Sequence, residues 1–166
     1  MAKFSTQRLL IILLLLPVIG IIAYSCKKYP DGPSVSIFSR VERVFGKYDI
    51  VSYTVDGADS LSLLNNKFDT IIYGFDAGTT AADTNFYEID YGSGKKYYSF
   101  WKLNNGDKNL CCGGLNYRGD PSHQIGPLAA PIELCFEVLR LTRNDLWLQK
   151  QYHGKTYVIK MKDRGI

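Results

Sequence analysis

From position 47 onward, apolar and polar residues alternate in short runs that turn-forming residues separate. A period of two is typical of a β-strand with one buried face. We expect eight strands, at residues 47–55, 68–75, 85–91, 95–103, 108–112, 132–141, 146–152 and 155–162. Most connections between these runs are short, which favours an antiparallel meander. Eight strands in a meander can close into an up-and-down barrel that leaves no exposed edge.

Particular residues encode the turns between these runs. Asn105-Gly106 gives the clearest hairpin signal, because this dipeptide readily adopts the positive φ angles of a type I′ turn. We expect further tight turns at residues 142–145 and 153–154. The connection at residues 113–131 is different, since it is long and rich in glycine and proline. A loop of this length inside a compact domain is usually functional or mobile.

Two stretches do not follow the period of two. In residues 36–45 apolar residues recur at helical intervals, and Ser39 and Glu42 have the spacing of a capping box. We expect a turn or two of helix there, with an extended stretch as the alternative. Residues 60–66 fit either a short strand or a short helix. The predicted fold class is therefore all-β: an eight-stranded antiparallel up-and-down barrel with a short N-terminal helical turn.

The start of the chain has a different character. Lys3 and Arg8 precede an apolar run at residues 9–23, which ends just before Ser25 and Cys26. This run matches the apolar region of an export signal, about 7–15 residues, and is shorter than the ~20 residues that a membrane-spanning helix needs. The order of basic segment, apolar run, small residue and cysteine resembles the signal of bacterial lipoproteins. In that family the cysteine sulfur receives the lipid before cleavage.

The lipoprotein resemblance implies three segments: a signal peptide at 1–25, a lipidated tether at 26–35 and a barrel domain at 36–166. Cys26 would carry acyl chains such as palmitate and attach the protein to a membrane. Position 27 is Lys, not the Asp that retains some lipoproteins at the inner membrane. We therefore expect the cell envelope as the location, at the outer membrane, on its periplasmic face or at the cell surface. An uncleaved membrane anchor and ordinary cleaved secretion are the alternatives.

The charge balance narrows the choice of partners. The formal net charge is +4, and basic and acidic residues are well mixed along the chain. A nucleic-acid-binding protein would instead cluster Lys and Arg on a strongly basic domain. We expect a monomer that binds no nucleic acid and needs no cofactor.

Four cysteines are present, and lipidation would use Cys26. In an oxidising compartment, one disulfide and one free thiol are the simplest arrangement of the other three. Cys111 and Cys112 are adjacent, so on a strand they face opposite ways and only one can easily meet Cys135. We take Cys112 with Cys135 as the candidate pair, with three small buried thiols as the alternative. Zinc binding with His123 is disfavoured, because adjacent cysteines lack the C-x₂₋₄-C spacing.

Two motifs resemble lipocalins. Gly46-Lys47-Tyr48, at the start of the first expected strand, looks like the lipocalin Gly-x-Trp signature with Tyr in the Trp position. Residues 136–148, FEVLRLTRNDLWL, are similar to the ending of lipocalin-like lipoproteins of Bacteroidota. The resemblance implies a lipocalin-like barrel that binds a small apolar or amphiphilic ligand.

The interior of an eight-stranded barrel has room for side chains or for one small ligand. Aromatic residues could line such a site through apolar burial and hydroxyl hydrogen bonds. The candidates are Tyr48, Tyr73, Tyr97, Trp101 and Trp147. The alternative is that these rings only fill the core.

Catalysis has few candidate residues, since the chain has two histidines and neither belongs to a nucleophile motif. We therefore expect a binding protein and not an enzyme. The alternative function is a non-enzymatic protein-interaction module of the cell envelope that uses the 113–131 loop.

Overall fold

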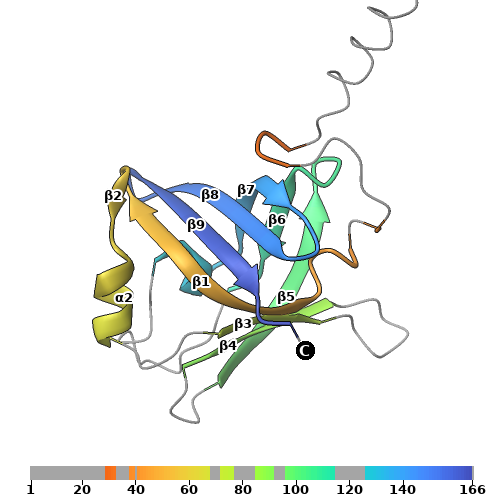
Figure 1. Ribbon diagram of the computed structural model, residues 1–166, viewed down its shortest axis with the longest axis horizontal. Coiled ribbons are helices and arrows are strands. Elements are labelled where there is room, and N and C mark those ends of the chain that lie inside the picture. Colours follow the sequence, from red (N-terminus) through yellow and green to blue (C-terminus); the bar gives the residue numbers. More distant parts are fainter. Residues whose placement is uncertain are drawn as a thin grey trace, which may run out of the picture.

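One antiparallel sheet makes up the body of the protein in the computed structural model (Figure 1). The structure describes residues 29–32, 38–39, 41–67, 72–76, 85–91, 96–114 and 126–165. The strands in these ranges are β1 (Gly46–Val55), β2 (Ala58–Asp59), β3 (Ile72–Asp76), β4 (Asn85–Asp90), β5 (Lys96–Asn104), β6 (Asn109–Cys112), β7 (Leu134–Leu141), β8 (Asp145–Tyr152) and β9 (Lys155–Asp163).

The sheet closes on itself. From β3 to β9 each strand pairs with the next one along the chain, and β1 pairs with both β3 and β9. The two-residue strand β2 pairs only with the last two residues of β1. β1 and β3–β9 therefore form a closed eight-stranded up-and-down barrel, which confirms the fold class that the alternating pattern predicts.

A capped turn precedes β1. The N–H of Ser39 donates to Glu42 Oε2 (2.8 Å), and the N–H of Glu42 donates to Ser39 Oγ (3.2 Å). This is the expected capping box. The N–H groups of Arg43 and Phe45 donate to the carbonyl oxygens four residues before them. The described part of this segment is one hydrogen-bonded turn and not a regular helix; residues 33–37 and 40 lie outside the described ranges.

This turn covers the end of the barrel where β1 begins and β9 ends, which we call the closed end. Val44 is fully buried in the core, and the Phe45 ring packs edge-on against Trp101, with ring centroids 5.9 Å apart. Arg43 is also buried, and its Nη1 donates to the carbonyl oxygen of Leu141 (3.1 Å). Apolar packing and one buried guanidinium therefore seal this end.

Of the ambiguous residues 60–66, all but the first lie in a helix, α2 (Leu61–Lys67), so this stretch is a helix and not a strand. Asp59 Oδ1 accepts a hydrogen bond from the N–H of Leu61 (3.0 Å) and stabilises the first turn. Leu64 is buried in the core cluster. α2 lies beside the far half of β1 (Figure 1), beyond the segment Gly46 to Asp49 that pairs with β3. The helix thus covers a part of the barrel wall where β1 and β3 are not paired.

The core consists of side chains at alternate strand positions. Its buried strand residues include Tyr48, Tyr53, Tyr73, Phe75, Tyr87, Ile89, Trp101, Leu110, Cys112, Phe136, Val138, Leu141, Leu146, Leu148, Ile159 and Met161. Two register shifts interrupt the alternation, one at Val51 in β1 and one at Leu139 in β7. The extra residue in β1 lets Tyr48 and Tyr53 point to the same side although they are five positions apart.

The disulfide joins Cys111 to Cys135, so the expected pairing of Cys112 with Cys135 is wrong. Cys111 lies directly opposite Cys135 in the register of β6 and β7. Cys112 faces the other side of the sheet and is a buried free thiol in the core. The register between the two strands decides the pairing, and residue spacing alone does not reveal it. The lipidation site predicted at Cys26 lies outside the described residues.

The described residues contain no helix that is long and apolar enough to cross a membrane. The predicted signal peptide at 1–25 and most of the tether at 26–35 lie outside the described ranges.

Candidate functional site

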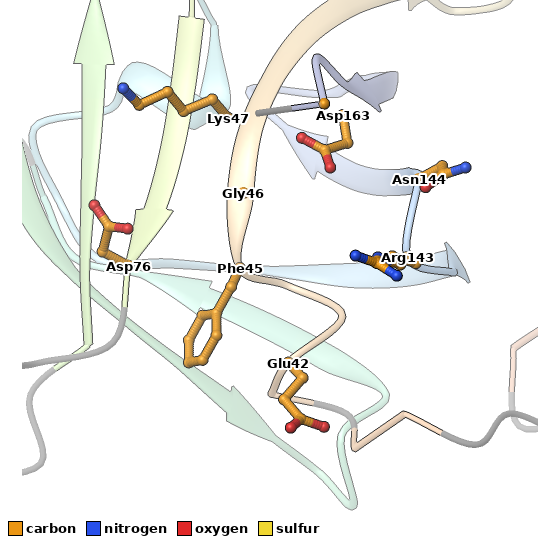
Figure 2. Close-up of a pocket in the computed structure, with 9 residues that line it drawn as sticks. Glu42, Phe45, Gly46, Lys47, Asp76, Arg143, Asn144 and Asp163 are labelled. Carbon is orange, nitrogen blue, oxygen red and sulfur yellow. The ribbon is translucent and has the colours of Figure 1, made fainter.

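A cleft of about 650 Å³, open to solvent, lies at the closed end (Figure 2). Its lining comes from the capped turn, the start of β1, the end of β3, the β7–β8 turn and the end of β9. The lining residues are Glu42, Phe45, Gly46, Lys47, Asp76, Arg143, Asn144, Asp163 and Gly165. The cleft lies between the ends of these elements and not in the barrel interior. Val44, buried in the core, and Phe45, packed against it, lie between the cleft and the interior.

Charges of both signs line this cleft. Lys47 and Asp76 point to one side of β1, whereas Arg143 and Asp163 lie on the other side (Figure 2). The hydrogen bonds from Ser39 hold the pKa of Glu42 below its usual value. No histidine, serine or cysteine is among the described lining residues. The cleft is therefore polar, without an arranged nucleophile and base, and it does not suit an apolar ligand.

Tyrosines gather at the opposite end of the barrel, where β1 ends and β9 begins. The ring centroids of Tyr53 and Tyr157 are 6.0 Å apart, and those of Tyr157 and Tyr152 are 6.4 Å apart. Tyr53 is buried in the core, whereas Tyr152 and Tyr157 are half-buried. The three rings form a continuous aromatic surface that runs from the core toward solvent.

Lys150 belongs to the same end of the barrel. It lies directly opposite Tyr157 in the regular pairing of β8 with β9. Leu146 and Leu148, which precede it at alternate positions, are fully buried in the core. Lys150 is half-buried on this inner face. We call Tyr53, Lys150, Tyr152 and Tyr157 the tyrosine mouth.

The described end of the 113–131 loop covers the tyrosine mouth. A short 3-10 helix, η2 (Pro127–Ala129), follows Gly126, and Ala129 is fully buried in the core cluster. Gly126 has a φ of 80°, and a Cβ placed there would overlap the hydroxyl of Tyr53 and lie 3.5 Å from the Tyr157 ring. The backbone at Gly126 thus rests directly on two tyrosines of the mouth.

Burial raises the pKa of Tyr53 well above its usual value, and the neighbouring Tyr157 adds to the shift. The hydroxyl of Tyr53 therefore stays protonated at neutral pH. A neutral phenol beside an apolar surface can give or accept a hydrogen bond, which suits an uncharged or amphiphilic molecule.

Four of the five residues predicted to line a ligand site face the barrel interior. Tyr48, Tyr73 and Trp101 are buried in the core, and Tyr97 is half-buried against it. Trp101 Nε1 donates to the carbonyl oxygen of Asp76 (3.2 Å) near the closed end. Tyr97 packs edge-on against Tyr91 at the other end of the sheet. Tyr48 and Trp101 therefore belong to the sealed half of the barrel.

Trp147 lies on the outer face, so its predicted place in the barrel lining is wrong. Its ring is between two cations: Arg140 Cζ lies 5.2 Å and Lys160 Nζ lies 4.2 Å from the ring centroid. The neighbours Leu146 and Leu148 point inward and are fully buried. A period of two through this strand would have placed Trp147 outside.

None of the four residues of the mouth is among the five lining residues predicted from the sequence. Lys150 continues the inward positions that Leu146 and Leu148 occupy, so alternation could have found it. Tyr53 could not be found in this way. Strict alternation from Tyr48 places it on the outer face, and the extra residue Val51 reverses that assignment.

The sulfurs of Cys111 and Cys135 and a carboxylate oxygen of Glu133 lie within 4.8 Å of one another. Both sulfurs are used by the disulfide, so this group does not offer thiolate ligands. His123, which was considered above as a zinc ligand together with these cysteines, lies outside the described ranges.

The strand pairing and the mouth define the class: a closed eight-stranded up-and-down barrel with one sealed end and one tyrosine-lined end.

No family model matches the chain. No curated protein matches it. Two solved structures are similar to it. One, a lipocalin-like protein from Bacteroides uniformis ATCC 8492, shares 17% identity at a TM-score of 0.45 and covers 71% of this chain and 97% of its own. The other, an uncharacterized protein from Bacteroides eggerthii DSM 20697, shares 20% identity at a TM-score of 0.41 and covers 72% and 98%.

Proposed function

We propose that the protein is a lipocalin-like binding protein, not an enzyme, and that it takes up a small apolar or amphiphilic ligand at the tyrosine mouth. The observation that carries this proposal is the continuous surface of Tyr53, Tyr157 and Tyr152 from the core to solvent. Aromatic rings bind apolar groups by burial, and their hydroxyls offer hydrogen bonds to a polar group. The closed end lacks this combination, because Val44 and Phe45 pack against the core there and the cleft outside them is lined mainly by charged and polar side chains.

Lys150 favours an amphiphile over a purely apolar molecule. None of the salt bridges between described residues involves it. An ammonium beside Tyr157 can hold an anionic or strongly polar headgroup while the apolar part lies against Tyr53. The segment at Gly126 must then move aside, since it rests on the same two tyrosines.

Titration with a fluorescent long-chain carboxylate and with the corresponding uncharged alcohol tests this proposal. We expect Tyr157→Ala to weaken binding of both probes about tenfold, because burial of an aromatic side chain contributes roughly 1–3 kcal/mol. Lys150→Glu should weaken binding of the carboxylate only. Tyr98→Ala is the control, since Tyr98 is exposed on the outer face of β5. Equal affinities for all four proteins would contradict the proposal.

We also propose that Cys26 anchors the protein in the cell envelope, at the outer membrane. The order of basic segment, apolar run, Ser25 and Cys26 supports this. The chain just after this cysteine is docked on the barrel: Tyr29 is buried, and the N–H of Asp31 donates to the carbonyl oxygen of Leu139 (2.8 Å). Mass spectrometry of the mature N-terminus tests the anchor. An intact Met1 or an unmodified Cys26 would contradict it.

One observation supports a second candidate, a protein-interaction module that uses the 113–131 loop. Exposed apolar side chains flank both ends of this loop. Phe100 packs over Gly113 at its start, and Ile132 follows its end. A purified envelope partner that loses affinity for Ile132→Asp but not for Tyr157→Ala would favour this function over ligand binding.

A further inference from the structure

The tether enters the barrel domain at one defined place. Tyr29 is 2% exposed and belongs to the core cluster, and the N–H of Gly32 donates to its carbonyl oxygen (3.1 Å). Asp31 donates its N–H to the carbonyl oxygen of Leu139 in β7. These contacts fix residues 29–32 beside β7.

The distance from this place to an anchored membrane is short. Three peptide units separate Cys26 from Tyr29, and an extended chain spans at most about 3.6 Å per residue, or roughly 10 Å in total. A lipid on Cys26 therefore holds the membrane surface close to residues 29–32. An uncleaved apolar run ending at Ala23 would allow only a few residues more.

The outer face beside the tether carries cations and a half-buried aromatic ring. Arg140 Nη1 donates to the carbonyl oxygen of Asp31 (2.7 Å), so this arginine contacts the tether itself. The same guanidinium stands over the Trp147 ring, and Lys160 Nζ stands over that ring as well. Arg140, Trp147 and Lys160 lie opposite one another on β7, β8 and β9. We call these three residues the basic-aromatic face.

Carboxylates near this face leave Lys160 available. Asp145 forms a salt bridge with Arg140 (3.0 Å), and Asp49 forms one with Arg164 (3.2 Å). None of the salt bridges between described residues uses Lys160. Its ammonium is therefore free of a carboxylate partner in this part of the chain and can contact an anionic lipid headgroup.

We propose that the basic-aromatic face lies against the membrane that holds the tether, with Lys160 at anionic headgroups and Trp147 in the interfacial layer. Tryptophan is enriched at this depth of a bilayer, and lysine is attracted to an anionic surface. The inference rests on the proposed anchoring. The barrel then lies on its β7–β9 side and not on its tyrosine mouth.

Fluorescence of the full-length protein in vesicles tests this orientation. The chain has two tryptophans, and Trp101 is buried in the core. The protein is reconstituted into phosphatidylcholine vesicles that contain phosphatidylglycerol and a phospholipid with brominated acyl chains. We expect the bromines to quench the emission of Trp147. In Trp147→Phe the ratio of emission with and without bromine should return to nearly one.

A pair of charge variants tests the proposed contact of Lys160 with anionic headgroups. Lys160→Glu should lower the fraction of quenched protein several-fold, because each basic residue near an anionic surface changes the equilibrium by roughly fivefold. Lys155→Glu is the matched control, since this substitution makes the same charge change on β9, but at the far end of the barrel. Added salt should reduce quenching of the wild type, because it screens the attraction.

Two results would overturn the inference, and they can be distinguished. A protein that stays with the vesicles on flotation but shows no quenching that depends on Trp147 would overturn the orientation alone. A protein that does not float with the vesicles would overturn the anchoring, and the orientation with it. Equal quenching of Lys160→Glu and Lys155→Glu would also reject the role of Lys160.

Discussion

The hydroxyl of Tyr48 donates a hydrogen bond to the carbonyl oxygen of Arg43 across 2.9 Å. This bond joins the start of β1 to the turn that seals the closed end. Burial raises the pKa of Tyr48 far above its usual value, and the nearby carboxylates of Asp163 and Asp145 raise it further. The hydroxyl therefore remains a donor throughout the neutral range.

We expect Tyr48→Phe to lower the free energy of unfolding by about 1–2 kcal/mol. The substitution keeps the ring but leaves the buried carbonyl of Arg43 without its donor. Urea denaturation measures the change. Tyr98→Phe removes a hydroxyl from an exposed position and should cost less than about 0.5 kcal/mol. Equal losses in the two variants would show that the Tyr48 hydrogen bond does not stabilise the closed end.

The disulfide should contribute substantially to stability. Cys111 and Cys135 are separated by 24 positions. Closing a loop of this size stabilises a protein by about 3 kcal/mol in the chain-entropy description. We expect Cys135→Ser to lower the free energy of unfolding by roughly that amount, and the variant should become insensitive to a dithiol reductant. Non-reducing peptide mapping is the check. A peptide that links Cys112 to Cys135 would contradict the structure.

The thiol of Cys112 should be unreactive in the folded protein. Burial raises its pKa from the ordinary value, so the reactive thiolate is disfavoured. We expect iodoacetamide to leave Cys112 of the native protein unmodified between about pH 7 and pH 9 and to modify it after unfolding in guanidinium chloride. Mass spectrometry counts the added groups. Rapid alkylation of Cys112 in the native protein would contradict its place in the core.

The same shift predicts a dependence of stability on pH. The pKa of the Cys112 thiol is higher in the folded protein than in the unfolded chain. Its contribution to the free energy of unfolding is therefore complete below the unfolded pKa of about 8.5 and declines as pH rises above that value. Urea unfolding at pH 7 and at pH 10 compares the two conditions. Cys112→Ala, which has no thiol at this position, should show a smaller decline than the wild type between these two pH values.

Gly126 should tolerate no side chain while the mouth is covered. Gly126→Ala places a methyl group on the Tyr53 hydroxyl and forces a positive φ on alanine. We expect a loss of more than about 2 kcal/mol. Gly57→Ala is the matched control, because Gly57 has nearly the same φ, 82°, and nothing lies within 4 Å of an added Cβ. It should cost only about 1 kcal/mol.

A second substitution separates the clash from the backbone strain. In Gly126→Ala with Tyr53→Phe the offending oxygen is absent, and the nearest remaining atom of that ring lies 3.4 Å from the added Cβ. We expect the double variant to be more stable than the sum of the single effects predicts. Thermal unfolding monitored by circular dichroism measures all four proteins. Simple additivity would show that Gly126 does not rest on Tyr53.

The fold was largely predictable because its signals are local. Asn105 and Gly106 have φ angles of 52° and 63°, and His153 and Gly154 have 49° and 75°. His153 and Gly154 are the two loop residues between the paired Tyr152 and Lys155, and positive φ at both is the type I′ conformation. Asn105 and Gly106 lie in a four-residue loop, because Asn104 pairs with Asn109. Alternation of apolar residues indicates which face of each strand is buried, and the mostly short connections favour the meander order that the sheet has.

The errors arose where the outcome depends on pairing between distant strands. The register of β6 with β7 places Cys111, not Cys112, opposite Cys135. The extra residue Val51 turns Tyr53 into the barrel and brings it to Tyr157. Neither a register nor a bulge leaves a mark in the local pattern of this chain. Trp147 is a different case, since Leu146 and Leu148 already indicated its outward direction.

The position of the tether also determines how a mechanical load would enter the molecule. A force applied at the proposed anchor would pass through Tyr29 and Asp31 to Leu139 and Arg140, so it would reach β7 before it reached the start of β1. The disulfide between Cys111 and Cys135 ties β7 covalently to β6. A pulling force on the domain would thus act first on two cross-linked strands, and only afterwards on the turn that seals the closed end.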